Sequence, residues 1–337
     1  MPGLILLFLL ISAWSAPAWA EAPAFHAGMV RIAVQDDVPF EAIVWYPTTA
    51  EETIAQVGPW PVASAKDAPL AGQGRLPVIL FSHGSGGSPW VHRDLAAHLA
   101  RDGFIVVAPV HVGDSAGHTE ARQEGRSLLV RPAQAVKALE AVLADPRFKT
   151  RADANRLGMI GFSAGGYTAL VLAGAKPDFS LAVDYCRSHP EDRGSCGNGQ
   201  RAGSGQALPA QAASWVPPGK LDLKALVLMD PLAITFDSAG LASVGMPVLL
   251  FSPQDTSYLI AEHNASVVAS GLPQPPQQVV VPGNHFVFID PCPPDMKAKA
   301  PEICLDQPGV DRPAIHARIE AEVSGFLRGC LSDSQVQ

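Results

Sequence analysis

The chain has 337 residues, of which 47% are hydrophobic and 17% charged, and its formal net charge is −8. This composition is close to globular averages and excludes a generally disordered chain, a collagen-like chain and a coiled coil. No dense run of Lys or Arg offers an electrostatic grip on nucleic acid or anionic lipid, so the expected partner is a small or neutral molecule. The length predicts one large domain, and 30 glycines with 31 prolines predict many loops.

The first 20 residues are predicted to be a signal peptide. Leu4 to Trp14 is an apolar run of suitable length, and Ala18 to Ala20 gives the small-x-small cleavage pattern before Glu21. No Lys or Arg precedes the run, and the alternative is an uncleaved anchor. The run is short for a bilayer span, and no later stretch approaches the roughly 20 apolar residues that a spanning helix needs. We therefore expect an exported protein, periplasmic or secreted, with no transmembrane segment in its mature chain.

The five cysteines fit an oxidising compartment. Cys186 and Cys196 lie close together in the sequence, as do Cys292 and Cys304, which favours two local disulfides. Cys330 is left over and could replace a member of the second pair, because sequence alone does not fix connectivity. No pair has the C-x-x-C spacing of a zinc site, so the cysteines are interpreted as structural.

Regular elements are predicted from hydrophobic periodicity. Met29 to Val34 and Phe40 to Tyr46 predict an opening antiparallel hairpin, and the stretch from there to Leu76 is interpreted as irregular. Strand-like runs then alternate with helical patterns, which predicts an α/β fold with a mostly parallel central sheet and helices on both faces. Strands are expected at Val78 to Ser82, Phe104 to Pro109, Leu157 to Phe162, Ala225 to Met229, Pro247 to Ser252 and Gln277 to Val281, and helices before Arg101 and at Pro132 to Leu143, Ile260 to Ser270 and Ala314 to Leu327.

The segment from Lys176 to Lys220 breaks this alternation and is rich in Gly, Ser, Pro, Gln and Ala. A connection of this length inside a compact domain is usually functional or disordered. We expect a single domain at 21–337 with an insertion at about 176–220. The insertion is either a lid or pocket wall, or a surface excursion held by one disulfide.

The strongest chemical signal is the G-x-S-x-G motif formed by Gly161, Ser163 and Gly165, directly after a predicted strand and before a helix. In that context the chain turns sharply, holds the serine in a strained conformation, and needs small residues on both sides for the backbone to pass. A chance glycine-rich turn is the alternative, and it is less favoured because candidate partners of the serine also occur. Ser163 is therefore the predicted nucleophile.

His285 is the predicted general base. A serine hydroxyl is a poor nucleophile at neutral pH, so it needs a histidine base and an acid that orients the imidazole. With this motif the acid and then the histidine follow the serine in the chain, and His285 lies late, in a turn just past a predicted strand. Four other histidines are disfavoured as the base. His263 and His316 lie in helical patterns and are expected at the solvated surface. His26 precedes the core, and His189 lies in the insertion.

Two aspartates compete for the acid. Asp255 and Asp230 both lie between Ser163 and His285, each at the carboxyl end of a predicted parallel strand. The loop before Asp255 is long enough to reach across, whereas Asp230 sits tight against its strand with Pro231 locking the turn. We predict Asp255 as the acid, with Asp230 as the alternative. The other aspartate is expected to be a helix cap, a turn residue or part of the pocket floor.

The glycine-rich segment SHGSGG follows the strand at Val78 to Ser82, where a second oxyanion amide is expected for this kind of site. The backbone amides of Ser85 and Ala164 are the predicted donors. His83 precedes the serine, so it is expected to support the loop or line the pocket rather than act as the base.

These segments resemble a known family. SHGSGG, DPRF, GFSAGGYTAL, GNHF and DPCP with Cys304 are similar to the dienelactone-hydrolase-related serine esterase branch of the α/β-hydrolases. That branch resembles the platelet-activating-factor acetylhydrolases and, more distantly, the polyester-cleaving cutinases. The resemblance spans roughly Val30 to Leu327, and it implies the α/β-hydrolase fold.

The resemblance also implies roles for single residues. It implies Ser163 as nucleophile, His285 as base, and the amides of Ser85 and Ala164 as oxyanion donors. True dienelactone hydrolases have a cysteine where this chain has Ser163. The acetylhydrolase pattern places the acid after the sixth strand, which matches Asp230, whereas dienelactone hydrolases and cutinases place it after the seventh, which matches Asp255.

The predicted function is a serine ester hydrolase that acts through an acyl-enzyme on a small-molecule or lipid-like ester, without a cofactor or metal. An amidase or peptidase on the same fold is one alternative, because such a triad does not encode the leaving group. A non-catalytic binding protein that retains the fold is another. Four residues are expected to line the pocket, although each could equally pack in the core: Trp90, His111, Trp215 and Phe286.

Overall fold

The computed structural model describes residues 25–123, 126–197, 212 and 214–332. The predicted signal peptide lies outside the described residues, as does part of the predicted insertion. The described strands form one ten-stranded sheet in the order β10-β9-β8-β7-β5-β6-β2-β1-β4-β3. They are β1 (His26–Val34), β2 (Phe40–Thr48), β3 (Thr53–Val57), β4 (Trp60–Lys66), β5 (Leu76–Ser82), β6 (Ile105–Pro109), β7 (Ala152–Phe162), β8 (Leu223–Met229), β9 (Val248–Pro253) and β10 (Gln277–Val281).

The predicted architecture is confirmed. All neighbouring pairs from β10 through β6 are parallel, and β2 joins β6 in antiparallel orientation. The strands β5, β6 and β8 are almost completely buried along their length, as expected for parallel strands with helices on both faces. The carboxyl ends of these strands meet at one edge of the sheet, which is where ligands bind in open α/β sheets.

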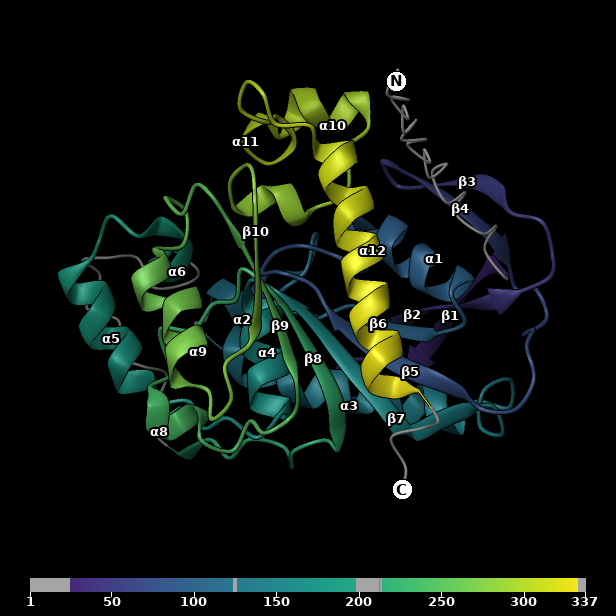
Figure 1. The fold of residues 1–337 in the computed structure, drawn as a ribbon, viewed down its shortest axis with the longest axis horizontal. Coiled ribbons are helices and arrows are strands. Elements are labelled where there is room, and N and C mark those ends of the chain that lie inside the picture. Colours follow the sequence, from purple (N-terminus) through teal and green to yellow (C-terminus); the bar gives the residue numbers. More distant parts are fainter. Residues whose placement is uncertain (1–24, 124–125, 198–211, 213, 333–337) are drawn as a thin grey trace, which may run out of the picture.

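Two layers of helices cover the sheet (Figure 1). Helices α1 and α12 pack on one face through residues such as Leu99 and Leu327, and α3 and α4 pack on the other through residues such as Leu139 and Leu170. The helical elements are η1 (Pro89–His92), α1 (Arg93–Arg101), α2 (Glu120–Gln123), α3 (Ser127–Ala144), α4 (Ala164–Leu172), α5 (Phe179–Ser188), α6 (Arg193–Cys196), α8 (Ser238–Leu241), η2 (Ala261–His263), α9 (Ala265–Gly271), η3 (His285–Phe288), α10 (Pro294–Lys299), α11 (Pro301–Cys304) and α12 (Arg312–Leu331).

The opening hairpin is confirmed, because β1 and β2 pair in antiparallel register from His26 with Thr48 to Val34 with Phe40. The irregular stretch predicted up to Leu76 is wrong. It contains a second antiparallel hairpin, β3 with β4, at the edge of the sheet. The side chains of β3 are largely exposed, so this strand lacks the apolar alternation from which a strand is predicted.

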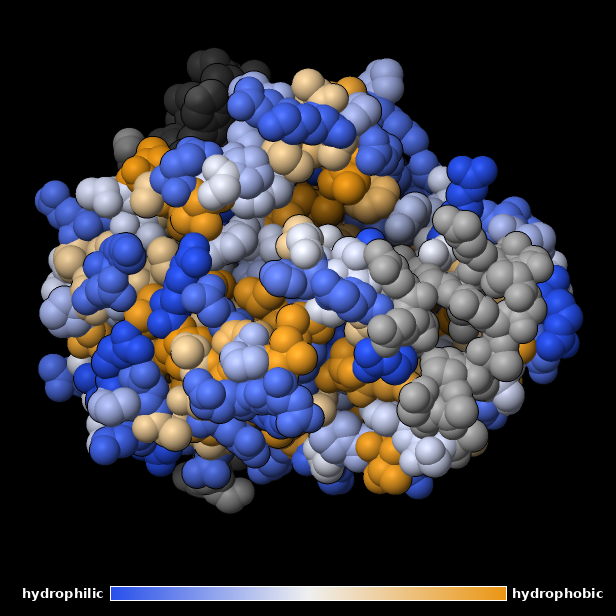
Figure 2. Space-filling view, turned by 180° about the vertical axis from the view of Figure 1, so that it is seen from behind, coloured by the Kyte–Doolittle hydropathy of each residue, from blue (hydrophilic) through white to orange (hydrophobic). Residues whose placement is uncertain are grey.

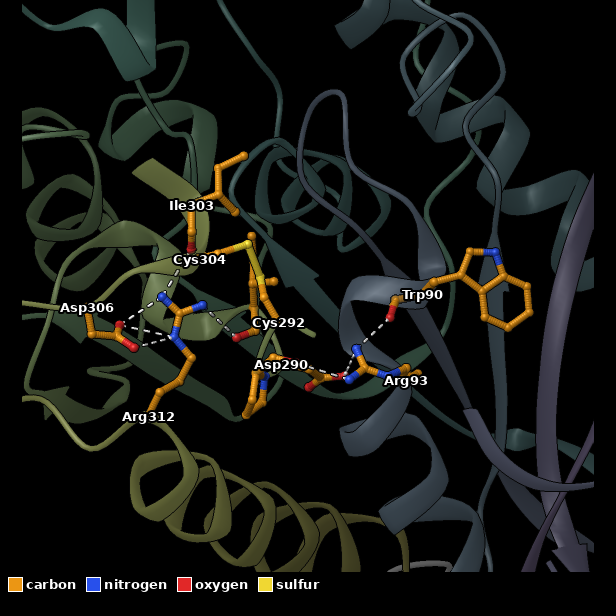
Figure 3. Close-up of a disulfide and its surroundings, with 10 residues drawn as sticks. Trp90, Arg93, Asp290, Cys292, Ile303, Cys304, Asp306 and Arg312 are labelled. Carbon is orange, nitrogen blue, oxygen red and sulfur yellow. Dashed lines mark hydrogen bonds and ion pairs between the residues drawn. A yellow bond between two sulfur atoms is a disulfide. The ribbon is translucent and has the colours of Figure 1, made fainter. Parts of the chain in front are cut away.

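Both predicted disulfides are confirmed, and the thiol of Cys330 is free. The bond from Cys186 to Cys196 joins α5 to α6 within the segment predicted as an insertion. The bond from Cys292 to Cys304 joins the segment after η3 to α11 (Figure 3). The two cysteines cluster with Trp60 and Val62 of β4. Each bond therefore fixes a loop-rich segment beside the sheet.

The surface is mainly hydrophilic on the side shown in Figure 2, and hydrophobic residues reach it in separate places between polar ones. Few large apolar side chains are strongly exposed among the described residues, and Ile54 on the edge strand β3 is 77% exposed. In the part of the chain that the structure describes, no helix has the length and apolar character needed to cross a membrane.

Candidate active site

Ser163 lies at the turn between β7 and α4, in an unusual backbone conformation. Its φ of 55° and ψ of −120° lie outside the regions that residues with a side chain normally adopt. The surrounding backbone holds this conformation: the Ser163 amide donates to the Met229 carbonyl at 3.1 Å, and the Ser163 carbonyl accepts from Leu232 at 3.0 Å. The turn therefore has the strained geometry expected for a nucleophile.

The glycines of the motif let this turn pack against its neighbours. A Cβ atom on Gly161 would lie 2.3 Å from the Gly165 carbonyl oxygen, and one on Gly165 would lie 1.9 Å from the Ser82 carbonyl oxygen. Both distances are far below a van der Waals contact. The G-x-S-x-G pattern thus follows from close backbone approaches on both sides of the serine.

We expect Gly165→Ala to lower the melting temperature, because the added methyl group forces α4 away from β5. Overpacking of this kind costs about 1–3 kcal/mol, occasionally more. Gly325→Ala on α12 is the matched control, since its added Cβ would meet no atom within 4 Å. Thermal denaturation of both variants tests this, and equal melting temperatures would contradict it.

His285 is buried at the start of η3, and its ring is held on two faces. It stacks on Phe162 at 4.7 Å between centroids and on Tyr258 at 4.5 Å. Because Phe162 directly precedes Ser163, the structure brings His285 beside the serine turn. The His285 Nδ1 lies 2.6 Å from the Asp230 Oδ2, so Nδ1 donates to a carboxylate and Nε2 is left as the basic nitrogen.

The prediction that Asp255 is the acid partner of His285 is wrong, because the alternative, Asp230, occupies that place. Asp230 is 1% exposed and has a φ of 42°, and its amide donates to the Phe251 carbonyl. From the sequence alone this tight turn argues against Asp230, but in the structure the turn directs the Asp230 carboxylate toward His285. Asp255 instead accepts from the Ser257 amide at 3.0 Å and from Gln307 at 2.7 Å, and the bonds from Ser257 lower its pKa. It is a turn residue.

The glycine-rich loop after β5 lies alongside the serine, since a Cβ atom on Gly84 would be 3.3 Å from the Ser163 Cβ. The amides of Ser85 and Ala164 donate to no acceptor among the described residues. Two unpaired donors next to a nucleophile suit a developing oxyanion. The loop that carries Ser85 and the first residue of α4, Ala164, therefore both adjoin Ser163.

A buried ion pair that the sequence reasoning missed supports this loop. Arg131 and Asp114 are fully buried, with 2.7 Å between Nη1 and Oδ2. The Asp114 Oδ1 accepts from the Ser85 hydroxyl at 2.7 Å and from the Gly86 amide at 3.1 Å, and Arg131 donates to the His83 carbonyl. The sequence indicates this ion pair through Arg131, a charged residue within the apolar helical pattern of α3.

The other predicted histidines take structural places. His83 and His111 are buried side by side under the loop, and burial together with the charge of Arg131 lowers the pKa of each well below the usual value. His111 is therefore core packing rather than pocket lining. His263 packs against Tyr185. The expectation of a solvated surface is wrong for His316, which is 6% exposed.

Of the other predicted pocket residues, Phe286 lies at the site and contacts both His285 and Tyr258. Trp90 packs edge-on against Trp45, and Trp215 packs edge-on against Phe179. Tyr258 was not predicted, because nothing in the sequence shows which aromatic ring lies on His285. Within the described ranges, no three His, Cys, Asp or Glu side chains are grouped so that they could hold a metal ion.

Comparison with known proteins gives a family match over part of the chain and several solved structures of similar fold. The chlorophyllase family model matches residues 51–185, a range that contains the Ser85 loop and Ser163. No curated protein matches the chain in sequence.

Solved structures with the same fold include two enzymes. One is a ferulic acid esterase from Streptomyces cinnamoneus, with 18% identity, a TM-score of 0.60, and coverage of 94% of this chain and 92% of that chain. The other is a dienelactone hydrolase from Anabaena variabilis ATCC 29413, with 16% identity, a TM-score of 0.51, and coverage of 91% and 99%. The chain has the α/β-hydrolase fold, as the resemblance of its motifs implied.

Proposed function

We propose that the protein is a serine hydrolase of carboxylic esters, with Ser163 as nucleophile, His285 as base and Asp230 as the acid. The observation that carries this proposal is the 2.6 Å contact from His285 Nδ1 to Asp230 beside a strained serine turn. The similarity to structures named as an esterase and a dienelactone hydrolase, and to the chlorophyllase family model, supports a hydrolase.

In the first half-reaction, the Ser163 Oγ attacks the acyl carbon while His285 Nε2 takes the hydroxyl proton. Asp230 stabilises the resulting imidazolium through Nδ1. The carbonyl oxygen becomes an oxyanion, and the amides of Ser85 and Ala164 donate to it. When the tetrahedral intermediate collapses, the bond to the alkoxy oxygen breaks, and His285 gives its proton to the leaving alcohol.

In the second half-reaction, water replaces the alcohol. His285 Nε2 takes a proton from the water as its oxygen attacks the acyl-enzyme, and the same two amides stabilise the second oxyanion. Collapse breaks the bond to Ser163 Oγ, which regains its proton from His285. The products are an alcohol and a carboxylic acid, and the enzyme returns to its starting state.

Turnover of p-nitrophenyl esters from acetate to palmitate tests this proposal and reveals the preferred acyl length. A matched p-nitroanilide separates an esterase from an amidase. The proposal expects saturable hydrolysis of at least one ester and much slower cleavage of the anilide. It fails if folded protein hydrolyses no ester, or if it cleaves the anilide faster.

We propose further that the protein is exported and that its substrate is a small-molecule or lipid-like ester. Two disulfides support an oxidising compartment. Intact-mass analysis of protein from the periplasm or medium should give a mature chain that begins at Glu21. Recovery of the full-length chain only from inside the cell would contradict export.

A further inference from the structure

The chain segment that follows His285 is held by hydrogen bonds from both helices on that face of the sheet. The Val287 carbonyl accepts from His316 Nε2 at 2.8 Å, and the Ile289 carbonyl accepts from Arg312 Nη1 at 3.4 Å, both from α12. The Asp290 Oδ2 accepts from the Asp94 amide of α1 at 2.7 Å. The turn that carries His285 is therefore tied to α12 and to α1.

Asp290 makes several contacts here, and Figure 3 shows its carboxylate beside Arg93. Its side chain is fully buried, and Arg93 Nη1 lies 3.7 Å from Oδ2. Its other oxygen, Oδ1, has no hydrogen-bond partner of good geometry and faces His316 Nδ1 at 3.4 Å. Asp290 thus presents an otherwise unsatisfied carboxylate oxygen to the His316 ring.

Both ring nitrogens of His316 consequently face acceptors: Nε2 faces the Val287 carbonyl, and Nδ1 faces the carboxylate of Asp290. A neutral imidazole has one N–H, so it can serve only one of them, and its second nitrogen then turns a lone pair toward an oxygen. The imidazolium has a proton for each. The geometry therefore suits the charged form of a histidine with a side chain only 8% exposed.

Most of the charged groups around His316 stabilise the protonated form of its ring. Burial lowers the pKa of His316, but Asp290, which faces the ring from the segment after η3, raises it, with smaller contributions from the Val287 carbonyl and Glu320. The net effect is a pKa above the usual value. From α1, Asp94 has a pKa raised to about 6, chiefly by burial. From η1, His92 has a pKa lowered to about 4, so it stays neutral. Arg93, next to Asp290, and Arg312, one turn before His316 on α12, are permanent cations nearby.

We propose that His316 is a positioning residue for His285: as an imidazolium it bridges the Val287 carbonyl and the Asp290 carboxylate, and loss of its proton loosens the His285 turn and lowers turnover. This inference rests on the proposed function. His285 and Val287 share one short helical turn, so a shift of Val287 moves the base. A misplacement of about 1 Å can reduce turnover by 10²-fold.

The direction of the pH dependence follows from the raised pKa. The bridge is complete below the usual histidine pKa of roughly 6.5 and is lost as the pH rises through the higher value in the folded protein. The proposal therefore expects a decline in kcat on the alkaline side.

The test measures kcat and KM for p-nitrophenyl acetate between about pH 5 and 9 in the wild type and in His316→Gln. The wild type should lose kcat several-fold through the alkaline step, with little change in KM. His316→Gln should have about a 10-fold lower kcat at neutral pH and no alkaline step, since a glutamine cannot lose a proton. His263→Gln, which alters a partly exposed histidine on η2, should keep the wild-type profile.

Asp290→Asn provides a second variant if His316→Gln does not fold. It removes the carboxylate that favours the cation, so the alkaline step should move to lower pH. Profiles that keep the wild-type shape in both variants, scaled only in height, would show a merely structural role and overturn the proposal.

Nuclear magnetic resonance of ring-labelled histidine separates this inference from the proposed function. In the wild type, the His285 ring signals should shift as His316 titrates, and the shift should be absent in His316→Gln. This readout needs no substrate. A protein that hydrolyses no ester but shows the coupled shift would refute the proposed function alone, whereas uncoupled signals would refute the inference alone.

Discussion

Ser163→Ala should lower ester turnover by about 10⁶-fold, as removal of the nucleophile does in a serine protease. Ser163 is only 6% exposed, and the turn around it is held by backbone bonds rather than by its side chain. The variant should therefore keep the melting temperature of the wild type. Steady-state kinetics and thermal denaturation are measured on the same preparation. Near wild-type turnover would remove Ser163 from the mechanism.

Asp230→Asn should lower turnover by about 10⁴-fold, by analogy with a serine protease whose acid was changed to its amide. The amide no longer accepts the proton of His285 Nδ1 as a carboxylate does, so the imidazole loses its favoured tautomer and the stabilisation of its cation. The shape of the side chain is nearly unchanged, so the fold should survive.

Asp255→Asn is the matched control, because the Asp255 carboxylate accepts from Ser257 and Gln307 rather than from His285. It should keep turnover within a few-fold of the wild type. A larger loss in Asp255→Asn than in Asp230→Asn would contradict the role of Asp230 and restore Asp255 as the acid.

The central sheet could be predicted because its strands are buried on both faces, so their sequences are continuous apolar runs. The pattern at Val78 to Ser82, for example, corresponds to β5, which is buried along nearly its whole length. The edge hairpin of β3 and β4 could not be predicted. An exposed strand has no such apolar run, and Pro59 and Pro61 argue against a strand at that place.

The serine and the histidine could be predicted because the motif and the chain order are local or linear features. The choice between two aspartates depends instead on the direction of a side chain. Asp230 reaches His285 through a left-handed backbone turn that cannot be inferred from the residue type, whereas the longer loop before Asp255 suggested a reach that it does not make.

The sequence of α12 does indicate that His316 is buried. His316 lies three residues before Ile319 and seven before Val323, which places it on the apolar face of α12. A histidine on that face must pack in the core and find polar partners there. Those partners, Val287 and Asp290, lie in a distant part of the sequence, so the sequence alone cannot identify them.

Covalent labelling with a fluorophosphonate tests the central claim most directly, because this probe reacts with serines that are activated as nucleophiles. The folded protein should gain one adduct at neutral pH, and peptide mapping should place it on Ser163. His285→Ala should react far more slowly, since its serine lacks a base. An adduct on another residue, or none in folded protein, would contradict the assignment of Ser163 as the nucleophile.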